Sequence, residues 1–105
     1  MSTEVEACEI ASTNDEFRRA GWGFMLTVGA QGLEDVVGLV EQVRSFSVFT
    51  EDNDPYGEHD FGSFTWYGEK VYWKIDYYDQ TLSGGLSPLS PDCRRILTIM
   101  LASEY

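Results

Sequence analysis

Cysteine is scarce in this chain, and the two that occur, Cys8 and Cys93, do not form a CxxC pair. A disulfide framework and a cysteine zinc site are therefore excluded, because both need several cysteines at short spacings. We expect two reduced thiols. Cys93 is a minor candidate for a reactive cysteine, because Arg94 and Arg95 follow it and a basic neighbourhood favours the thiolate.

Long apolar runs are absent as well. No run approaches the roughly 20 residues that a membrane-spanning helix needs. The segment Met1–Glu6 has neither the basic nor the apolar region of a secretory signal, so we expect a soluble cytoplasmic protein without a membrane partner. Apolar residues still make up 43% and aromatic residues 14% of the 105 positions, which suits one packed domain.

Basic residues are few: 7 Lys and Arg stand against 18 Asp and Glu, and the formal net charge is −11. Such a field repels nucleic acids and anionic membranes, so direct nucleic-acid binding is disfavoured and a basic protein surface is the favoured partner. The plainer alternative is that the charge only keeps the protein soluble. The pairs Arg18–Arg19 and Arg94–Arg95 are expected to form ion pairs at the surface.

The residue patterns predict a single α+β domain, with an antiparallel sheet of three to four strands packed against two or three helices. Helices are indicated at residues 3–20 and 33–46. The first either runs through or restarts at Thr13, where a capping-box pattern begins. The last apolar stripe, after the N-cap pattern Ser90–Asp92, predicts a third helix. The predicted order is helix 3–20, strand 22–28, turn 29–32, helix 33–46, short strand 46–50, hairpin strands 61–66 and 71–78, and a helix from residue 90 to the end.

The acidic loop, residues 51–62, is the segment in which we look for function. It contains five carboxylates, the only histidine, a proline and two glycines, but no basic residue. Asn53, Asp54 and Gly57 are typical turn residues, so we expect a stiff loop that presents negative charge at a small entropic cost on binding. The residues expected to bind a partner are Glu51, Asp52, Asp54, Tyr56, Glu58, His59 and Asp60.

The same loop also contains partial patterns of a metal site and of a catalytic site. The run Asp52–Gly57 resembles half of a calcium-binding EF-hand loop, but Ser63 stands where the bidentate glutamate belongs. We therefore expect no metal and no cofactor. As an enzyme, a hydrolase-like site would use His59 with Asp76 and Tyr56, although no nucleophile-elbow pattern is present and Asp79 is another potential partner of the imidazole.

Three long motifs resemble a small bacterial family of unknown function. They lie at residues 53–62, 73–79 and 95–105 and read NDPYGEHDFG, WKIDYYD and RILTIMLASEY. Phe17–Arg19 also fits the start of the family's pattern. The resemblance covers about residues 10–105, which leaves residues 1–9 as either a flexible or a family-atypical extension. It implies a frequent location on plasmids and other mobile elements, near genes suspected of opposing host defence. It implies no catalytic residues.

These observations favour an acidic interaction protein that inhibits a host DNA-handling defence complex. The expected target is a nucleic-acid-binding effector or nuclease, and the expected mode is anti-CRISPR or anti-restriction action, with clustered carboxylates imitating DNA phosphates. The alternative is the small enzyme built on His59. A third hypothesis is an accessory subunit of a plasmid-maintenance or toxin–antitoxin system.

Overall fold

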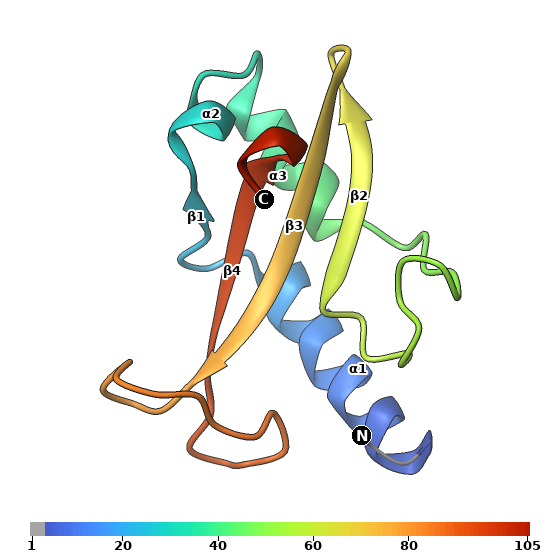
Figure 1. Ribbon diagram of the computed structural model, residues 1–105, viewed down its shortest axis with the longest axis vertical. Helices are drawn as coiled ribbons and strands as arrows, with labels where there is room; N and C mark the ends of the chain where they lie inside the picture. Colours follow the sequence, from blue (N-terminus) through green and yellow to red (C-terminus); the bar gives the residue numbers. More distant parts are fainter. Residues whose placement is uncertain (1–3) are drawn as a thin grey trace.

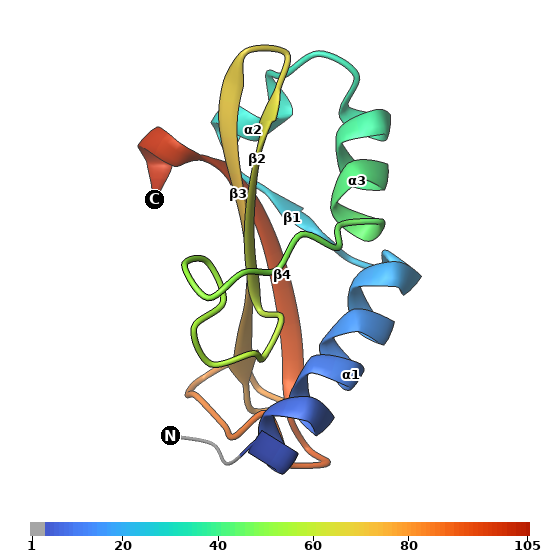
Figure 2. The same ribbon diagram turned by 90° about the vertical axis from the view of Figure 1, so that its right-hand side faces the viewer.

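The computed structural model describes residues 4–105, which form an open four-stranded sheet with helices α1 and α3 on one face (Figure 1, Figure 2). The strand order is β1-β4-β3-β2, with β1 parallel to β4 and the other pairs antiparallel. The predicted α+β class is confirmed, although the sheet is mixed. The elements are α1 Glu4–Ala20, β1 Met25–Leu26, α2 Val28–Gln31, α3 Val36–Arg44, β2 Phe61–Trp66, β3 Glu69–Tyr78, β4 Arg94–Leu101 and the 3-10 helix η1 Ala102–Glu104.

Helix α1 runs without a break from Glu4 to Ala20, as predicted for that range, and the predicted restart at Thr13 is wrong. The Thr13 hydroxyl donates to the Glu9 carbonyl one turn earlier, so it does not act as a cap. Residue 3 of the predicted helix lies outside the described residues. The buried stripe of α1 recurs every three or four residues and consists of Ala7, Ile10, Ala11, Asn14 and Arg18. No helix within residues 4–105 is long and apolar enough to cross a membrane.

The strand predicted for residues 22–28 is reduced to the two residues of β1. Gly21 and Gly23 adopt positive φ angles of 70° and 67°, which interrupts extended backbone before Met25. Thr27 then caps α2 by accepting a hydrogen bond from the Ala30 amide at 3.3 Å. The predicted turn at 29–32 is therefore largely this one-turn helix.

Helix α3 begins three residues later than predicted, because Asp35 is its N-cap instead of a first-turn residue. The Asp35 carboxylate accepts a hydrogen bond from the Gly38 amide at 3.1 Å. A Cβ at Gly38 would collide with that carboxylate, so the glycine makes room for the cap. Arg44 lies in the last turn as predicted, where it complements the helix dipole.

The predicted hairpin of β2 and β3 is confirmed, although β3 begins at Glu69, two residues earlier than predicted. Its two-residue turn, Tyr67–Gly68, has φ angles of 49° and 83°. Positive φ angles at both turn residues give the backbone conformation that matches the twist of two paired strands. Val71, Trp73 and Ile75 alternate along β3 and are buried toward the helices. They form one core with Leu39 and Val43 of α3, and with Leu97 and Ile99 of β4.

The helix predicted for residues 90–105 is wrong, because residues 94–101 form strand β4. This strand lies between β1 and β3, and both of its faces are covered in part: Leu97 and Ile99 are buried on the helix side, and Met100 is buried on the other. A strand that is apolar on both faces loses its period-two signal, so a short apolar run can be mistaken for a helix. The segment also contains Ile96, Thr98 and Ile99, which are β-branched residues and favour a strand.

The strand predicted for residues 46–50 is also absent. Phe46 and Phe49 both turn inward, with ring centroids 5.2 Å apart, and both pack on Trp73. In a strand, residues separated by three positions point to opposite faces. The segment instead curves around the core. Val48, which lies between Phe46 and Phe49 in the sequence, remains 65% exposed.

Gly62 of β2 gives a test of core packing. A Cβ at this buried position would collide with Trp73 Nε1 and lie 2.8 Å from Phe46. We expect Gly62→Ala to lower the free energy of unfolding by about 2–3 kcal/mol, as overpacking does in a dense core. The measurement is urea unfolding followed by tryptophan fluorescence.

Gly32→Ala is the matched control for Gly62→Ala. A Cβ at Gly32 meets only the Gly29 carbonyl at 3.6 Å and the Val28 carbonyl at 3.8 Å, and the Gly32 φ is −83°. This variant should keep its stability or gain up to about 1 kcal/mol. Equal unfolding midpoints for the two variants would contradict the packing described for Gly62.

Candidate functional site

The acidic loop follows α3 and lies beside the β2 edge of the sheet (Figure 1). Its turns form as the sequence indicates. Asn53 Oδ1 accepts from the Thr50 amide at 2.9 Å, and the Asp54 amide donates to the Thr50 carbonyl at 2.8 Å. Gly57 donates to the Asp54 carbonyl and has a φ of 67°, the conformation that favours glycine.

Asp54 is an internal cap of this loop and not a surface charge. It is only 8% exposed, and its Oδ1 accepts hydrogen bonds from the amides of Glu58 at 3.1 Å and His59 at 3.2 Å. His59 has a φ of 55°, which is costly for a residue with a side chain. The two hydrogen bonds to Asp54 stabilise that turn, so Asp54 shapes the loop from inside.

The His59 imidazole lies between two carboxylates from distant parts of the chain. Its Nδ1 is 3.0 Å from Asp15 Oδ1 of α1, and its Nε2 is 3.7 Å from Asp54 Oδ2. The ring stacks on Phe49 with centroids 3.9 Å apart and an angle of 3° between the planes. The imidazole, 28% exposed, therefore attaches the loop to α1.

Asp15 also binds the buried guanidinium of Arg18, at 2.9 Å from Nη1. Arg18 is 1% exposed, its Nη2 donates to the Phe46 carbonyl at 2.9 Å, and its guanidinium lies over the rings of Phe49 and Trp73. The expectation of a surface ion pair for Arg18 is wrong. Asp15, a carbonyl and two aromatic faces replace much of the water that a guanidinium would otherwise need, although the buried Arg18 Nε has no hydrogen-bond partner among the described residues.

A second polar group connects the loop to the sheet through Asn14, which is fully buried. Asn14 Nδ2 donates to the Glu58 carbonyl at 3.0 Å and to the Tyr77 hydroxyl at 2.9 Å. Its Oδ1 accepts from Arg95 Nε at 2.6 Å. Arg95 is thus also part of the interior network, not of a surface ion pair.

The hydrogen-bond network continues from Tyr77 to Asp60, because the Tyr77 hydroxyl donates to the Asp60 carboxylate at 3.2 Å. Burial raises the pKa of the Asp60 carboxyl above its usual range; the hydrogen bond from Tyr77 opposes that rise, and the charges of Glu58 and Asp54 add to it. Burial, followed by the nearby Asp60 charge, raises the pKa of Tyr77. Asp60 is therefore held at the base of the loop in a site that disfavours its charge.

The seven residues predicted to bind a partner thus divide into two groups. Glu51, Asp52 and Tyr56 point outward, and Tyr56 is 59% exposed. The half-buried residues Glu58, His59 and Asp60 and the buried Asp54 take part in the loop's own structure. The sequence did not single out Asn14, Asp15 or Tyr77, because their roles depend on contacts between distant segments.

The residues suggested for an enzyme are not assembled around His59. Asp76 forms an ion pair with Lys74 at 2.9 Å, and strand alternation places it on the sheet face opposite to Tyr77. Asp79 accepts hydrogen bonds from Thr81 and Ser83 in its own loop, and these bonds lower its pKa. The carboxylates at the imidazole are Asp15 and Asp54. Within residues 4–105, no three His, Cys, Asp or Glu side chains are grouped so that they could hold a metal ion.

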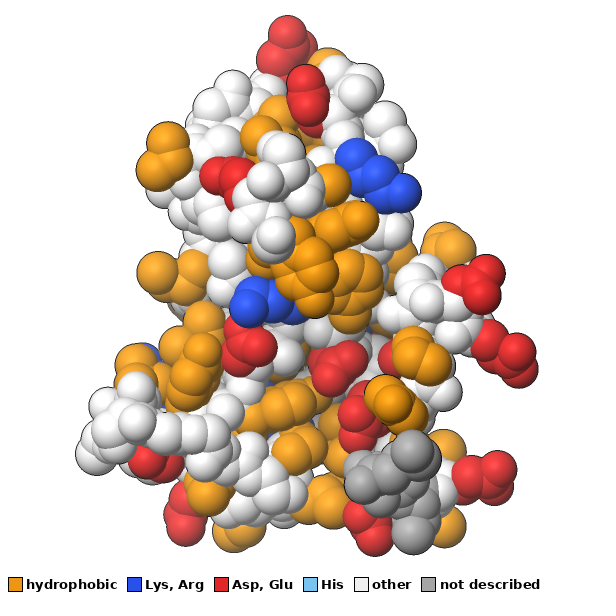
Figure 3. Space-filling model, in the orientation of Figure 1, with side chains coloured by type: hydrophobic (Ala, Val, Ile, Leu, Met, Phe, Trp, Pro, Cys, Tyr) orange, Lys and Arg blue, Asp and Glu red, His pale blue; other side chains and the backbone are white. Residues whose placement is uncertain are grey.

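Most of the remaining carboxylates are exposed. Figure 3 shows acidic side chains scattered over the helix-free face of the sheet, among hydrophobic and uncharged side chains and few cationic ones. Three of the basic residues are taken up by ion pairs with Asp15, Glu41 and Asp76. The exposed acidic residues are Glu4, Glu9, Glu16, Glu34, Asp35, Glu41, Glu51, Asp52, Glu69, Asp92 and Glu104. The surface is thus strongly anionic, and the outer part of the acidic loop belongs to it.

One family model matches the chain over residues 26–104, and its description is "Protein of unknown function (DUF3768)". The match includes strands β2, β3 and β4, the second residue of β1 and the acidic loop, and it begins after α1. Searches of curated proteins and of solved structures gave no match.

The burial of Arg18 predicts a large effect of its removal. Arg18→Ala leaves Asp15 and the Phe46 carbonyl without their guanidinium partner and opens space beside Phe49 and Trp73. We expect it to lower the free energy of unfolding by about 3–5 kcal/mol in urea titrations. The neighbouring Arg19→Ala is the control, because Arg19 is exposed and only its carbonyl is used, by Arg44. Its change should stay within about 0.5 kcal/mol, and similar losses for both variants would refute the interior role of Arg18.

The raised pKa of Asp60 predicts a pH-dependent effect of Asp60→Asn. The native state holds the Asp60 proton more tightly than the unfolded state, so ionisation of this group lowers stability as the pH rises from about 4 through the native pKa. Asparagine cannot ionise and keeps an oxygen for the Tyr77 hydroxyl. We expect a higher Tm than wild type at pH 7 and a difference that shrinks toward pH 3.5. The exposed Asp52→Asn is the control, and a Tm gain for Asp60→Asn that is independent of pH would argue against this cause.

Proposed function

We propose that this chain, which belongs to the DUF3768 family of proteins of unknown function, is an acidic interaction protein that binds a basic surface of a DNA-handling protein. The observation that carries the proposal is the anionic surface, which combines a net charge of −11 with exposed carboxylates on the outer acidic loop. Opposite charge favours both the encounter with a cationic partner and the register of the complex.

The construction of the acidic loop supports its use as a contact surface. Asp54 closes the loop from inside, and Asp15 and Asn14 of α1 hold His59 and the Glu58 carbonyl. Glu51 and Asp52 are therefore presented on a backbone that is already ordered. Less conformational entropy is lost when such a loop binds than when a mobile acidic tail does.

The resemblance to proteins of plasmids and mobile elements favours a host defence complex as the target. A restriction enzyme or a CRISPR effector has a basic channel for DNA, and duplex DNA carries about one negative charge per 1.7 Å of its axis. A small protein that presents clustered carboxylates on a folded scaffold can occupy such a channel. On this proposal the chain acts as an anti-restriction or anti-CRISPR inhibitor by DNA mimicry.

The alternative of a small enzyme retains one supporting observation, the pairing of a partly exposed His59 with Asp15. Both ring nitrogens face carboxylates and one ring face is covered by Phe49, which agrees better with a structural role. If affinity purification from the native host recovers no basic DNA-handling complex, the enzyme reading gains weight.

The proposal is tested by reversing the charge of the outer loop. The tagged chain is used to purify partners from the native host, and the identified partner is then titrated against variants. We expect Glu51→Lys combined with Asp52→Lys to weaken binding by about tenfold or more and to reduce its dependence on salt concentration. Asp54 is left unchanged, because its loss would disturb the loop itself.

The matched control is Glu34→Lys combined with Glu69→Lys, which changes the net charge equally. These exposed residues lie at the other end of the sheet, near the hairpin turn (Figure 1). This control should weaken binding much less. An equal loss in both double variants would show a diffuse charge effect without a loop site, and unchanged affinity in the loop variant would exclude DNA mimicry by this loop.

A further inference from the structure

Strand β4 is paired over its full length along only one of its two edges. Its partner β3 runs beside it from Arg94 to Leu101. On the other edge, β1 pairs only with Thr98 and Ile99. In the described part of the chain, no strand accompanies Arg94–Leu97 on that side. An unpaired edge in a sheet is a template for another strand.

The direction of the backbone identifies the groups that face this gap. The Thr27 amide donates to the Ile99 carbonyl, so the backbone groups of Ile99 point toward the β1 side. Backbone groups of alternate residues in a strand point to the same edge, so the N–H and C=O groups of Leu97 and Arg95 also point toward this side. Leu97 adjoins the Met25–Thr98 pair, so Arg95 is the residue that lies clear of β1. The Ile96 groups point toward β3, opposite Asp76. Arg95 therefore offers one donor and one acceptor to an incoming strand.

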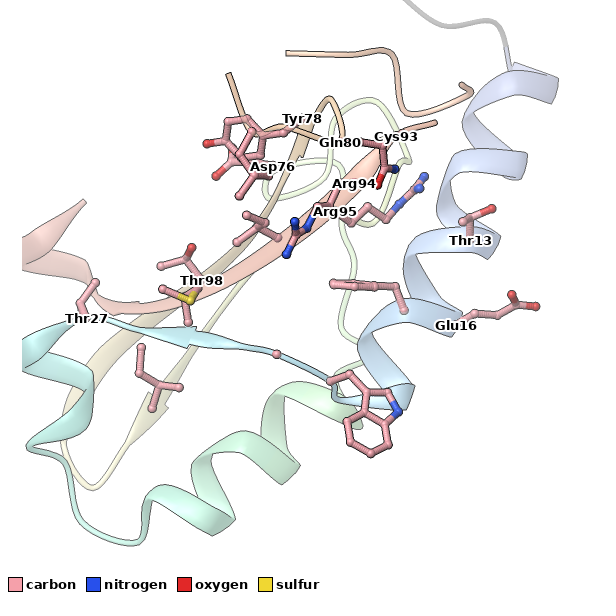
Figure 4. A pocket seen from close by; sticks show the side chains of 17 residues that line it. Thr13, Glu16, Thr27, Asp76, Tyr78, Gln80, Cys93, Arg94, Arg95 and Thr98 are labelled. Atoms are coloured by element: carbon pink, nitrogen blue, oxygen red, sulfur yellow. The ribbon is translucent and has the colours of Figure 1, made fainter. Parts of the chain in front are cut away.

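A groove of about 1310 Å³ lies along this edge, with α1 on one side of β4 and the end of β3 and the loop after it on the other (Figure 4). Figure 4 shows Thr13 and Glu16 of α1 on one side and Arg94 and Arg95 of β4 on the other. Three large apolar side chains in its lining are exposed: Trp22 by 80%, Met25 by 57% and Leu82 by 41%. Apolar groups of this size beside an unpaired strand are what an extended peptide needs in order to bind.

We propose that this groove binds an extended peptide segment of another protein, which adds a strand to β4 at Arg94–Leu97. The segment lies where β1 would continue if it were longer. At about 3.3 Å per residue, the four open residues of β4 suit a segment of about four to six residues. Its alternate apolar side chains contact Trp22 and Met25. The groove itself holds Arg94 and Arg95 beside Glu16 and Asp76, so the basic residues of the segment lie at its flanks, outside the groove, where the net charge of −11 favours them.

The occupant is a partner peptide and not a second copy of the chain, because of charge. Pairing two copies through β4 would bring together two proteins that each carry a net charge of −11. A basic peptide gains from the same field that opposes self-association. The groove is separate from the outer acidic loop, so this inference stands independently of the proposed inhibitor function.

The first test is amide hydrogen exchange on the intact, unliganded chain, followed residue by residue by NMR. The Arg95 amide should exchange much faster than the Ile96 amide, since only the latter faces β3. A slow Arg95 amide together with a dimer in sedimentation would show that a second copy closes this edge. A slow Arg95 amide in a monomer would show that the edge is already satisfied. Either result overturns the proposal.

The second test selects binders from a phage-displayed library of random 12-residue peptides and titrates the synthesised winners. We expect basic peptides with alternating apolar residues that slow exchange of the Arg95 amide on binding. Arg95→Pro removes the edge N–H, whereas the matched Arg95→Ala removes the same side chain and keeps the N–H; proline is tolerated at edges where the N–H is unpaired. The proline variant should bind at least about tenfold more weakly than the alanine variant.

Two further variants keep the test decisive if Arg95→Pro does not fold. Trp22→Ala removes an exposed wall of the groove and should weaken peptide binding about tenfold, whereas Val37→Ala, 83% exposed on α3, should leave it unchanged. The proposal is overturned if the library yields no binder above background, if bound peptides leave the Arg95 amide unprotected, or if Trp22→Ala and Val37→Ala bind equally well.

Discussion

The buried guanidinium of Arg18 is the interaction on which the arrangement around the acidic loop depends. It joins α1 to the segment after α3 through the Phe46 carbonyl, and to the sheet through the face of Trp73. It also fixes Asp15, which in turn holds His59 of the loop. A buried charge that loses a partner is strongly destabilising, so these segments can keep their positions only together.

This constraint separates two kinds of carboxylate that look alike in the sequence. Asp15 and Asp54 are held by interior hydrogen bonds and give the loop its shape. Glu51 and Asp52 are exposed and give it its charge. The number of acidic residues in a segment therefore does not measure the size of its contact surface, because some of these residues are buried and stabilise the loop itself.

Local patterns predicted the parts of the structure that are decided locally. The hairpin follows from alternation in β3 and the turn at Tyr67–Gly68, and the turns of the loop follow from Asn53 and Gly57. Strand β4 was mistaken for a helix because its position inside the sheet makes it apolar on both faces. The burial of Arg18 depends on Phe49 and Trp73, which no sequence spacing relates to it, so a surface ion pair was the natural but wrong expectation.

Asn14 connects the two surfaces for which we propose a binding role. Its amide holds the Glu58 carbonyl of the acidic loop, while its oxygen accepts from Arg95, whose backbone faces the α1–β4 groove. Helix α1 thus contributes to both surfaces, although it lies outside the residues matched by the family model. The matched region contains the acidic loop and the edge of β4. Helix α1 adds the polar groups that hold the acidic loop, and it forms one wall of the groove beside β4. Because one buried amide contacts both, a displacement of α1 at the groove would also strain the loop's attachment at Glu58.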